Sequence, residues 1–305
     1  MNLSRRPRDA PGSSNKRDRS STTSETALSS RSPKSSMLSF LAAAAASART
    51  PSLGVVDGNA VANASKFPFV AVQFTGTDAA SGQFCGGSLI SAAWVLTAAH
   101  CLEKSQKLER TVTVGVHRRD LSLKDATREG GVNIRVNCSV PHPLYKQSPY
   151  LYDIALLQLE HGVGGAVAPI PLDDGTHAIS GSAAIVLGWG SQDVACTKYD
   201  PILRRGDVTV AGDAECEAAA GGRTGYNKTL VLCAGKRRTH SWVETGCGDS
   251  GGPLLVSHPN GAKPYPYVQV GVVSWGYGNT YDVYSRVAGH LAWIQETIRT
   301  GAALV

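Results

Sequence analysis

The chain has 305 residues, 42% of them apolar, with 30 lysines and arginines against 24 acidic residues and a formal net charge of +6. Nine of the basic and three of the acidic side chains precede residue 55, so residues 55–305 carry 21 of each and are neutral. A basic excess points to nucleic acid or an anionic membrane only when the folded domain carries it. The charge therefore excludes both as expected partners of residues 55–305, and the apolar content is sufficient for a sizeable core.

The first 54 residues divide into two segments. Residues 1–36 are basic, rich in serine and poor in apolar residues, and such a segment cannot bury enough surface to offset its ordering entropy. We therefore predict a disordered leader there. Residues 37–54 begin with an apolar, alanine-rich stretch whose longest run is residues 40–46. That run is far shorter than the roughly 20 residues needed to span a bilayer, so we expect no stable membrane insertion.

The alanine-rich stretch has more than one interpretation. Its small residues near Ala46-Ser47-Ala48 resemble a signal-peptide cleavage site, which predicts secretion. The 36 residues before this stretch are too many for the start of an ordinary signal peptide, unless Met37 is the true start. A transit peptide to an organelle and a short helix in a propeptide are the alternatives.

Cysteines and glycosylation sequons favour secretion among these interpretations. All seven cysteines follow residue 55, as do three Asn-x-Ser/Thr sequons. The sequons are Asn63-Ala-Ser65, Asn137-Cys-Ser139 and Asn227-Lys-Thr229. Disulfides and N-linked glycans form on the secretory route, so we expect an extracellular glycoprotein.

Short runs rich in β-branched and aromatic residues, separated by Gly, Pro, Asn and Asp, predict strands from residue 69 onward. The runs are Phe69–Phe74, Gly87–Ile90, Val112–Val116, Val132–Val136, Ile154–Leu159, Ala183–Leu187, Asp207–Val210, Pro253–Val256 and Val268–Ser274. Without amphipathic helices between them, strands of this length favour an all-β barrel or sandwich. Residues 290–299 are the exception, because Leu291, Ile294 and Ile298 share one helical face.

Three segments combine the residue types of nucleophilic catalysis. Residues 94–101 end in His100 and Cys101, residues 152–159 open with Tyr152 and Asp153, and residues 246–253 place Ser250 among glycines. Glycines let the backbone turn sharply and bring N–H groups close to a bound carbonyl. A histidine activates a serine by removing its proton, and an acid fixes the histidine tautomer. Each segment alone has an ordinary structural explanation, but the three together predict a catalytic relay.

Six motifs in register are similar to the trypsin/chymotrypsin family of serine endopeptidases. They are Cys85-Gly-Gly-Ser-Leu-Ile90, Leu96-Thr-Ala-Ala-His-Cys101, Asp153-Ile-Ala-Leu156, Gly188-Trp-Gly190, Gly248-Asp-Ser-Gly-Gly-Pro253 and Val273-Ser-Trp-Gly276. The resemblance covers essentially all of residues 55–299. It implies an all-β peptidase domain over 55–305, with two six-stranded antiparallel β-barrels and a C-terminal α-helix. The barrels are expected at about 55–169 and 170–288, with the active site between them.

The resemblance also implies a role for each motif residue. Ser250 is expected to be the nucleophile, His100 the general base and then acid, and Asp153 the orienting carboxylate. The backbone N–H groups of Gly248 and Ser250 are expected to form the oxyanion hole. The segment from Ser274 to Gly276 resembles the one that pairs with the backbone of an extended substrate.

Activation of a zymogen is implied by Val55-Val56-Asp57-Gly58, which resembles the N-terminus that the family gains when its propeptide is cleaved. Asp249 is then the buried partner of the Val55 amine, since an unpaired buried carboxylate is costly. Gly54 stands where the family usually has Arg or Lys, so cleavage after a basic residue is in question.

Two disulfides follow from the resemblance, Cys85–Cys101 and Cys216–Cys233. A third family bridge is missing, because Gly246 and Asn279 occupy its positions. Cys247 is then expected to face the loop that contains Cys196, and we hypothesise a Cys196–Cys247 bridge. Cys138 is left free or paired between molecules.

Two carboxylates are expected to set the substrate pocket. Glu244 stands at the position that forms the pocket floor in the family, and Asp282 at a wall position that is usually glycine. If both acids line the pocket, burial with a like charge raises the pKa of one of them, and a lysine or arginine of the substrate would relieve their repulsion. The longer glutamate favours Lys over Arg because it makes the pocket shallower. In the alternative, Glu244 turns outward into solvent.

The predicted function is therefore that of a secreted serine endopeptidase acting after basic residues. Protein or peptide substrates and protein protease inhibitors are the expected partners. The sequence has no HExxH motif or metal-type Cys/His spacing, so no metal and no cofactor are expected. The alternative is a catalytically weak or inactive protease homologue that acts as a binding module, and the intact His100, Asp153 and Ser250 set argues against it.

Overall fold

The computed structural model describes residues 55, 58–76, 79–103, 110–193, 195–219, 226–237, 242–258, 263–276 and 281–301. All of them belong to one unit, Arg49–Val305. The predicted leader, residues 1–36, and the signal-like segment, residues 37–54, lie outside the described residues.

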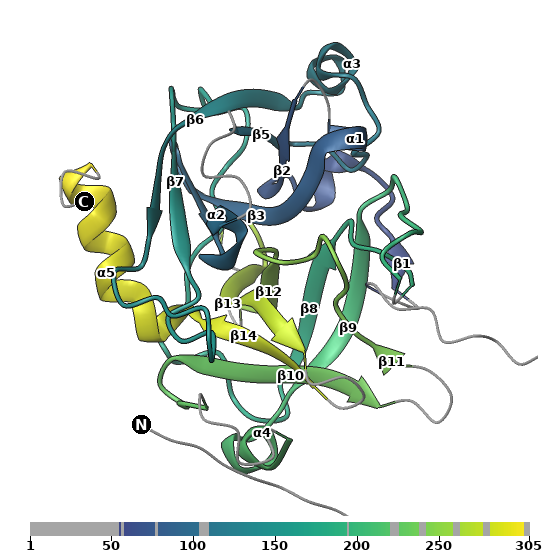
Figure 1. Cartoon of the computed structure of the whole chain (residues 1–305). Helices are drawn as coiled ribbons and strands as arrows, with labels where there is room; N and C mark the ends of the chain where they lie inside the picture. Colours follow the sequence, from purple (N-terminus) through teal and green to yellow (C-terminus); the bar gives the residue numbers. More distant parts are fainter. Residues whose placement is uncertain are drawn as a thin grey trace, which may run out of the picture. The chain divides into compact units, whose positions relative to one another are not determined.

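Six antiparallel strands from the first half of the domain close into a barrel (Figure 1). They are β2 (Val70–Thr75), β3 (Gln83–Ser91), β4 (Trp94–Thr97), β5 (Arg110–Val114), β6 (Val132–Pro141) and β7 (Ala155–Leu159). Their order around the barrel is β2-β3-β4-β7-β6-β5, and pairing of β5 with β2 closes it. Closure removes the exposed sheet edges that would otherwise pair with other chains.

A second closed barrel follows. Its strands are β8 (Ala183–Gly188), β9 (Arg204–Val210), β10 (Val231–Arg237), β12 (Pro253–Ser257), β13 (Tyr267–Gly276) and β14 (Asp282–Arg286). Their order is β9-β8-β12-β13-β14-β10, and β9 pairs with β10 to close the barrel. The fold is therefore the predicted pair of six-stranded antiparallel β-barrels.

Two short strands extend the second sheet. They are β1 (Asn59–Ala60), which pairs with β9, and β11 (Trp242–Val243), which pairs with β10. Although β1 precedes the first barrel in the chain, it hydrogen-bonds to the second one. This pairing carries the chain at residues 59–60 across to the second barrel.

The cores follow from the strand pattern. In β2 the residues from Val70 to Phe74 are all buried, because both faces of this strand are covered. One apolar cluster fills the first barrel and continues to Leu187 and Trp189 at the end of β8. A second cluster lies within the second barrel and includes Val55 and Tyr284. Burial of such apolar area is the main stabilising contribution to a fold of this kind.

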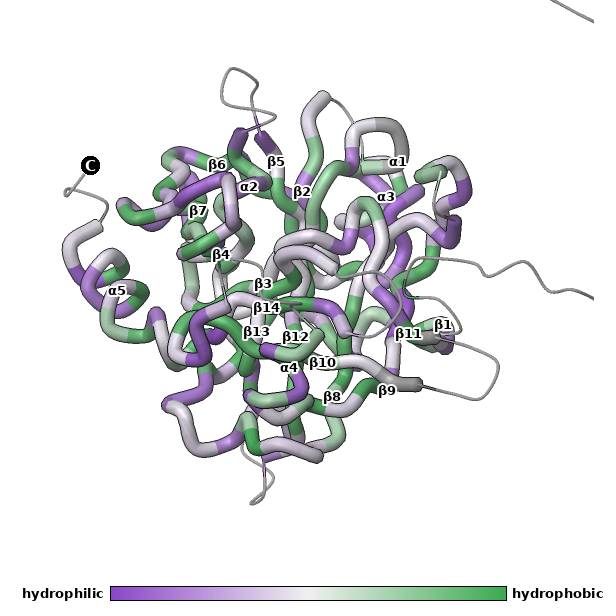
Figure 2. The backbone as a smooth tube through the Cα atoms, turned by 60° about the horizontal axis from the view of Figure 1, so that its bottom comes forward, coloured by the Kyte–Doolittle hydropathy of each residue, from purple (hydrophilic) through white to green (hydrophobic). Residues whose placement is uncertain are grey.

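The terminal helix, α5 (Val287–Thr300), begins three residues before the predicted start at 290. It ends at Gly301, whose φ of +67° is the left-handed conformation common at helix ends. Ile294 is fully buried and packs in a cluster with Trp94 and Leu156 of the first barrel. Hydrophilic and hydrophobic residues alternate along α5, so the helix presents one apolar face (Figure 2).

Short helices that the strand pattern did not predict occupy the connections. They are η1 (Ala64–Lys66), α1 (Ala79–Gly82), α2 (His100–Glu103), α3 (Leu123–Arg128) and α4 (Asp213–Ala219). Each spans no more than about two turns, which is too short for a helical period to be visible in the sequence. Among the described residues, no helix is long and apolar enough to cross a membrane.

Candidate active site

His100 opens the short helix α2, directly after strand β4 of the first barrel. Its side chain is 17% exposed, so the ring is partly open to solvent. The ring of Tyr150 stands edge-on to it, with the two centroids 5.9 Å apart. This position leaves His100 held by the barrel yet reachable by a substrate.

Asp153 is fully buried two residues before β7, and three donors fix its carboxylate. Its Oδ2 lies 2.7 Å from His100 Nδ1 and accepts from Ser274 Oγ at 2.5 Å. Its Oδ1 accepts the backbone N–H of His100 at 2.8 Å. A carboxylate on Nδ1 holds the proton there and leaves Nε2 as a base, which is the tautomer that a serine nucleophile requires.

Ser250 lies in the turn between β11 and β12, where the backbone packs onto the first barrel. Its carbonyl oxygen accepts the N–H of Gly86 at 2.8 Å. The next residue, Gly251, has φ +80°, and a Cβ there would lie 2.2 Å from Thr97 Oγ1. Only glycine fits such a position, so this turn is built for a close approach to the end of β4, which leads to His100.

The Ser250 hydroxyl makes no hydrogen bond to His100 in this structure, although both side chains are half-buried. Hydrogen bonds between catalytic groups are often long or absent before a substrate binds, so the arrangement is compatible with a relay. Gly248 has φ +94°, a conformation that favours glycine. Within the described part of the chain, the N–H groups of Gly248 and Ser250 donate to no other group. Both remain available to a developing oxyanion.

Asp249 is fully buried beside Ser250. Its Oδ1 accepts the N–H of Gly190 at 2.7 Å, and its Oδ2 accepts the N–H of Gly246 at 2.9 Å. The backbone N–H of Val55 is a third donor, yet burial still raises the pKa of Asp249 to about 6. A Cβ at Gly188 would lie 1.9 Å from the Asp249 carboxylate, so this glycine makes room for it. The structure thus places the backbone N–H of Val55 against the Asp249 carboxylate.

The three disulfides differ in position and exposure. Cys85–Cys101 joins β3 to α2, and Cys216–Cys233 joins α4 to β10. Cys196–Cys247 joins the loop after Gly190 to the segment before Ser250. The hypothesised third bridge is therefore bonded in the structure. Cys138 forms no disulfide and is half-buried.

Asp282 is 6% exposed and its Oδ2 accepts the N–H of Thr245 at 2.7 Å. Burial raises its pKa to about 7, and the charges of Glu244 and Asp249 act in the same direction. Glu244 is half-buried and forms a parallel bridge with Val55. The two acids are therefore close enough to repel each other. Burial also raises the pKa of the nearby Tyr284 well above its usual value.

Ser274 and Gly276 lie at the end of β13. Ser274 is buried and its hydroxyl donates to the Asp153 carboxylate, whereas Gly276 is exposed. An exposed strand end has unpaired backbone groups that an extended peptide can join. Gln83 was not predicted from the sequence, and its Nε2 donates to the Gly248 carbonyl oxygen at 3.2 Å. No motif marks such a residue, because the contact joins positions 165 residues apart.

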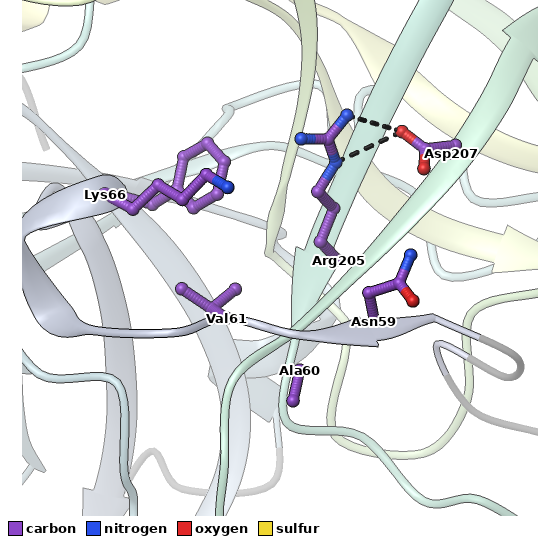
Figure 3. A pocket seen from close by; sticks show the side chains of 7 residues that line it. Asn59, Ala60, Val61, Lys66, Arg205 and Asp207 are labelled. Carbon is purple, nitrogen blue, oxygen red and sulfur yellow. Dashed lines mark hydrogen bonds and ion pairs between the residues drawn. The ribbon is translucent and has the colours of Figure 1, made fainter.

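Other polar clusters and grooves lie outside this constellation. Asp173, Asp174 and His177 group together, but His177 Nδ1 is already paired with Asp173 Oδ1 at 3.0 Å, so we assign no metal to them. A groove of about 290 Å³ lies against β1 and β9. Arg205 within it is held by Asp207 at 2.6 Å (Figure 3). None of the relay residues lines this groove.

Comparison with known proteins identifies the family. The family model described as Trypsin matches residues 55–294. Coagulation factor XII of Sus scrofa is 32% identical over 267 residues, which is 81% of this chain and 40% of that protein. Granzyme B(G,H) of Mus musculus is 34% identical over 221 residues, which is 71% of this chain and 80% of that protein.

A solved structure supports the same assignment. Neuropsin, a serine protease expressed in the limbic system of mouse brain, superposes with a TM-score of 0.65 at 27% identity. The match covers 80% of this chain and 99% of that one. The chain spans less than half the length of the factor XII proteins it matches, 40% and 45%. The chain belongs to the trypsin family of serine endopeptidases.

Proposed function

We propose that residues 55–305 hydrolyse peptide bonds, with Ser250 as nucleophile, His100 as general base and then acid, and Asp153 as the orienting carboxylate. The observation that carries the proposal is the 2.7 Å contact between Asp153 Oδ2 and His100 Nδ1. It sets the one ring tautomer in which Nε2 can take the Ser250 proton.

The expected chemistry has two halves. Ser250 Oγ attacks the scissile carbonyl carbon while His100 Nε2 removes its proton, and the same proton then passes to the leaving amine. Water, deprotonated by His100, afterwards hydrolyses the acyl-enzyme. The N–H groups of Gly248 and Ser250 would stabilise the oxyanion in both halves, and losing one such donor costs about 10²- to 10³-fold in turnover.

We propose further that the pocket prefers basic side chains, lysine above arginine. The support is the pair Glu244 and Asp282, since burial and a like charge raise the pKa of Asp282 to about 7. A lysine ammonium would relieve this repulsion, whereas an apolar side chain would leave both acids desolvated. A peptide-library profile tests this preference. Cleavage mainly after Phe, Tyr or Leu, unchanged in Glu244→Gln and Asp282→Gly variants, would contradict it.

Secretion as a zymogen is part of the proposal. Three disulfides suit an oxidising compartment, and the asparagines of all three sequons, Asn63, Asn137 and Asn227, are exposed. Val55 is 1% exposed beside Asp249, where a free amine would find its partner. Protein or peptide substrates and protein inhibitors are the proposed partners.

Labelling with a fluorophosphonate tests the catalytic assignment. The chain is prepared with a removable tag so that cleavage leaves Val55 first, and it is compared with the uncleaved chain and with Ser250→Ala. We expect one label on Ser250 of the cleaved chain and none on the variant.

A non-catalytic homologue that acts as a binding module is the alternative. The family match along residues 55–294 and the fixed Asp153–His100 contact do not favour it. A correctly folded, cleaved chain that takes no label would establish this alternative instead.

A further inference from the structure

Only one of the three disulfides is open to solvent. Cys85, Cys101, Cys216 and Cys233 are each no more than 4% exposed. Cys247 is exposed and Cys196 is half-buried. Thiol–disulfide exchange begins with attack of a thiolate on a sulfur atom, so its rate depends on access to that sulfur. Among these bridges, Cys196–Cys247 is therefore the one that a thiol in solution can reach.

The accessible bridge lies on the segment that carries the oxyanion donors. Cys247 stands between Gly246 and Gly248, and its carbonyl oxygen accepts the N–H of Ser191 at 2.8 Å. Asp249, two residues on, is anchored by the N–H of Gly190. Residues 246–250, which we call the oxyanion segment, are thus held by Gly190 and Ser191, and the disulfide to Cys196 is the covalent part of this contact.

The Cys196 side of the bridge is held more firmly than the Cys247 side. Asp193 organises the turn, accepting from Ser191 Oγ at 2.6 Å and from Thr197 N at 2.7 Å. The N–H of Cys196 itself donates to the Asp193 carbonyl oxygen at 3.1 Å. Cys247, by contrast, has a glycine on each side, and glycine restricts the backbone least. Opening the bridge would therefore loosen the oxyanion segment around Cys247 and leave Cys196 in place for reclosure.

We propose that Cys196–Cys247 is a thiol–disulfide exchange site for small thiols of the glutathione class, and that it controls the oxyanion segment. A thiolate attacks Cys247 Sγ, the S–S bond breaks, and Cys196 leaves as a thiolate that takes up a proton. A second thiolate then attacks the sulfur of the small thiol in the mixed disulfide and releases Cys247. The balance is two thiols oxidised to one small disulfide and one protein disulfide reduced to two thiols.

The consequence for activity rests on the proposed function, but the exchange itself does not. With the bridge open, the segment that carries the Gly248 and Ser250 N–H groups loses its covalent tie. It keeps the hydrogen bonds that Gly190 N–H donates to the Asp249 carboxylate and Ser191 N–H donates to the Cys247 carbonyl oxygen. We therefore expect kcat to fall about tenfold, less than the 10²- to 10³-fold loss that follows complete removal of an oxyanion donor.

The experiment titrates the full chain, cleaved before Val55, with reduced glutathione under native conditions. Free thiols are then trapped with N-ethylmaleimide and mapped by mass spectrometry, and kcat is measured on the same samples. We expect Cys196 and Cys247 to be the first bonded cysteines trapped, or Cys247 to carry glutathione. Activity should fall in parallel and return when oxidised glutathione is added.

Two variants serve as controls. Cys196→Ser/Cys247→Ser should have a kcat lowered about tenfold that glutathione no longer changes. Cys138→Ser, which lacks the half-buried free thiol on β6, should respond to glutathione as the parent chain does.

Several outcomes would overturn the proposal. One is that Cys85–Cys101 or Cys216–Cys233 is reduced before Cys196–Cys247. Another is that no bridge is reduced until the chain unfolds and all three open together. The third is that kcat stays unchanged once Cys196–Cys247 is open. Failure of the proposed protease function would be detected by a different measurement, fluorophosphonate labelling. A chain whose oxidised form takes no fluorophosphonate label would refute the protease, while the trapping pattern would still decide the exchange site.

Discussion

The Ser274 hydroxyl donates to the Asp153 carboxylate at 2.5 Å, although 121 residues separate them in the chain. Ser274 belongs to β13 of the second barrel, and Asp153 precedes β7 of the first. The oxygen that receives Ser274 also faces His100 Nδ1. Both barrels therefore act on the carboxylate that orients the histidine.

Replacing Ser274 by alanine should lower kcat about tenfold, because a hydrogen bond to a charged group contributes about 1.5–3 kcal/mol and part of that orients Asp153. The measurement is steady-state kcat and KM on a peptide ester. Ser285→Ala is the matched control, since its hydroxyl donates to the Asp153 backbone oxygen at 2.6 Å instead. Equal losses of kcat in the two variants would show that Ser274 supports the structure around Asp153 and does not orient its carboxylate.

The preference for lysine should depend on pH through Asp282, whose pKa burial raises to about 7. Above pH 7 this group is charged and attracts an ammonium, and below it the charge is lost. The ratio of kcat/KM for a Lys substrate to that for a Leu substrate should fall about tenfold from pH 8 to pH 6. Effects of pH on the chemical step that the two substrates share cancel in the ratio.

Asp282→Asn provides the check on this pH dependence. Its Lys-to-Leu ratio should be lower than that of the parent at pH 8 and flat over the same pH range. A parent ratio that stays constant with pH would mean that Asp282 does not contribute to the pocket.

Cleavage before Val55 should stabilise the domain through Asp249. Burial raises the Asp249 pKa to about 6, so the ionised carboxylate lowers the free energy of unfolding of the uncleaved chain. This loss of stability is absent below about pH 4 and complete above pH 6. It amounts to about 3 kcal/mol, and the ammonium created at Val55 would offset it. The Tm of the cleaved chain should exceed that of the uncleaved chain by about 6–12 °C at pH 7, and by much less at pH 4.

Asp249→Asn is the control for that difference, because its side chain carries no charge at either pH. The two forms of this variant should melt within about 2 °C of each other at pH 7. A large difference that persists in the variant would assign the stabilisation to ordering of the chain around Val55 rather than to the carboxylate.

Acid should destabilise the domain through His290, which is 2% exposed and lies against the rings of His142 and Tyr152. Burial lowers its pKa to about 4. Its contribution to stability is therefore complete above pH 6.5 and is lost as the pH falls toward 4. In urea unfolding, the loss of stability from pH 7 to pH 4.5 should be about 2 kcal/mol smaller in His290→Leu than in the parent. His161→Leu, at an exposed position, should lose as much as the parent.

The amino-acid sequence was sufficient to predict the strands and to single out three residues as a candidate relay. Runs such as Phe69–Phe74 and Ile154–Leu159 became β2 and β7, because β-branched and aromatic residues between turn residues have few other stable arrangements. The motifs around His100, Asp153 and Ser250 fixed the family because their residue order is specific. The short helices α3 and α4 escaped prediction, since two turns display no readable period.

Which groups meet, and how far each is buried, follows from the folded arrangement and not from the order of residues. That Asp282 accepts from Thr245, that Val55 reaches Asp249, and that Cys247 is the exposed half of its bridge depend on contacts between distant segments. Burial and neighbouring charge set a pKa, and access sets the reactivity of a disulfide. Neither quantity is a property of a residue in the chain, because both arise only when two closed barrels bring their loops together.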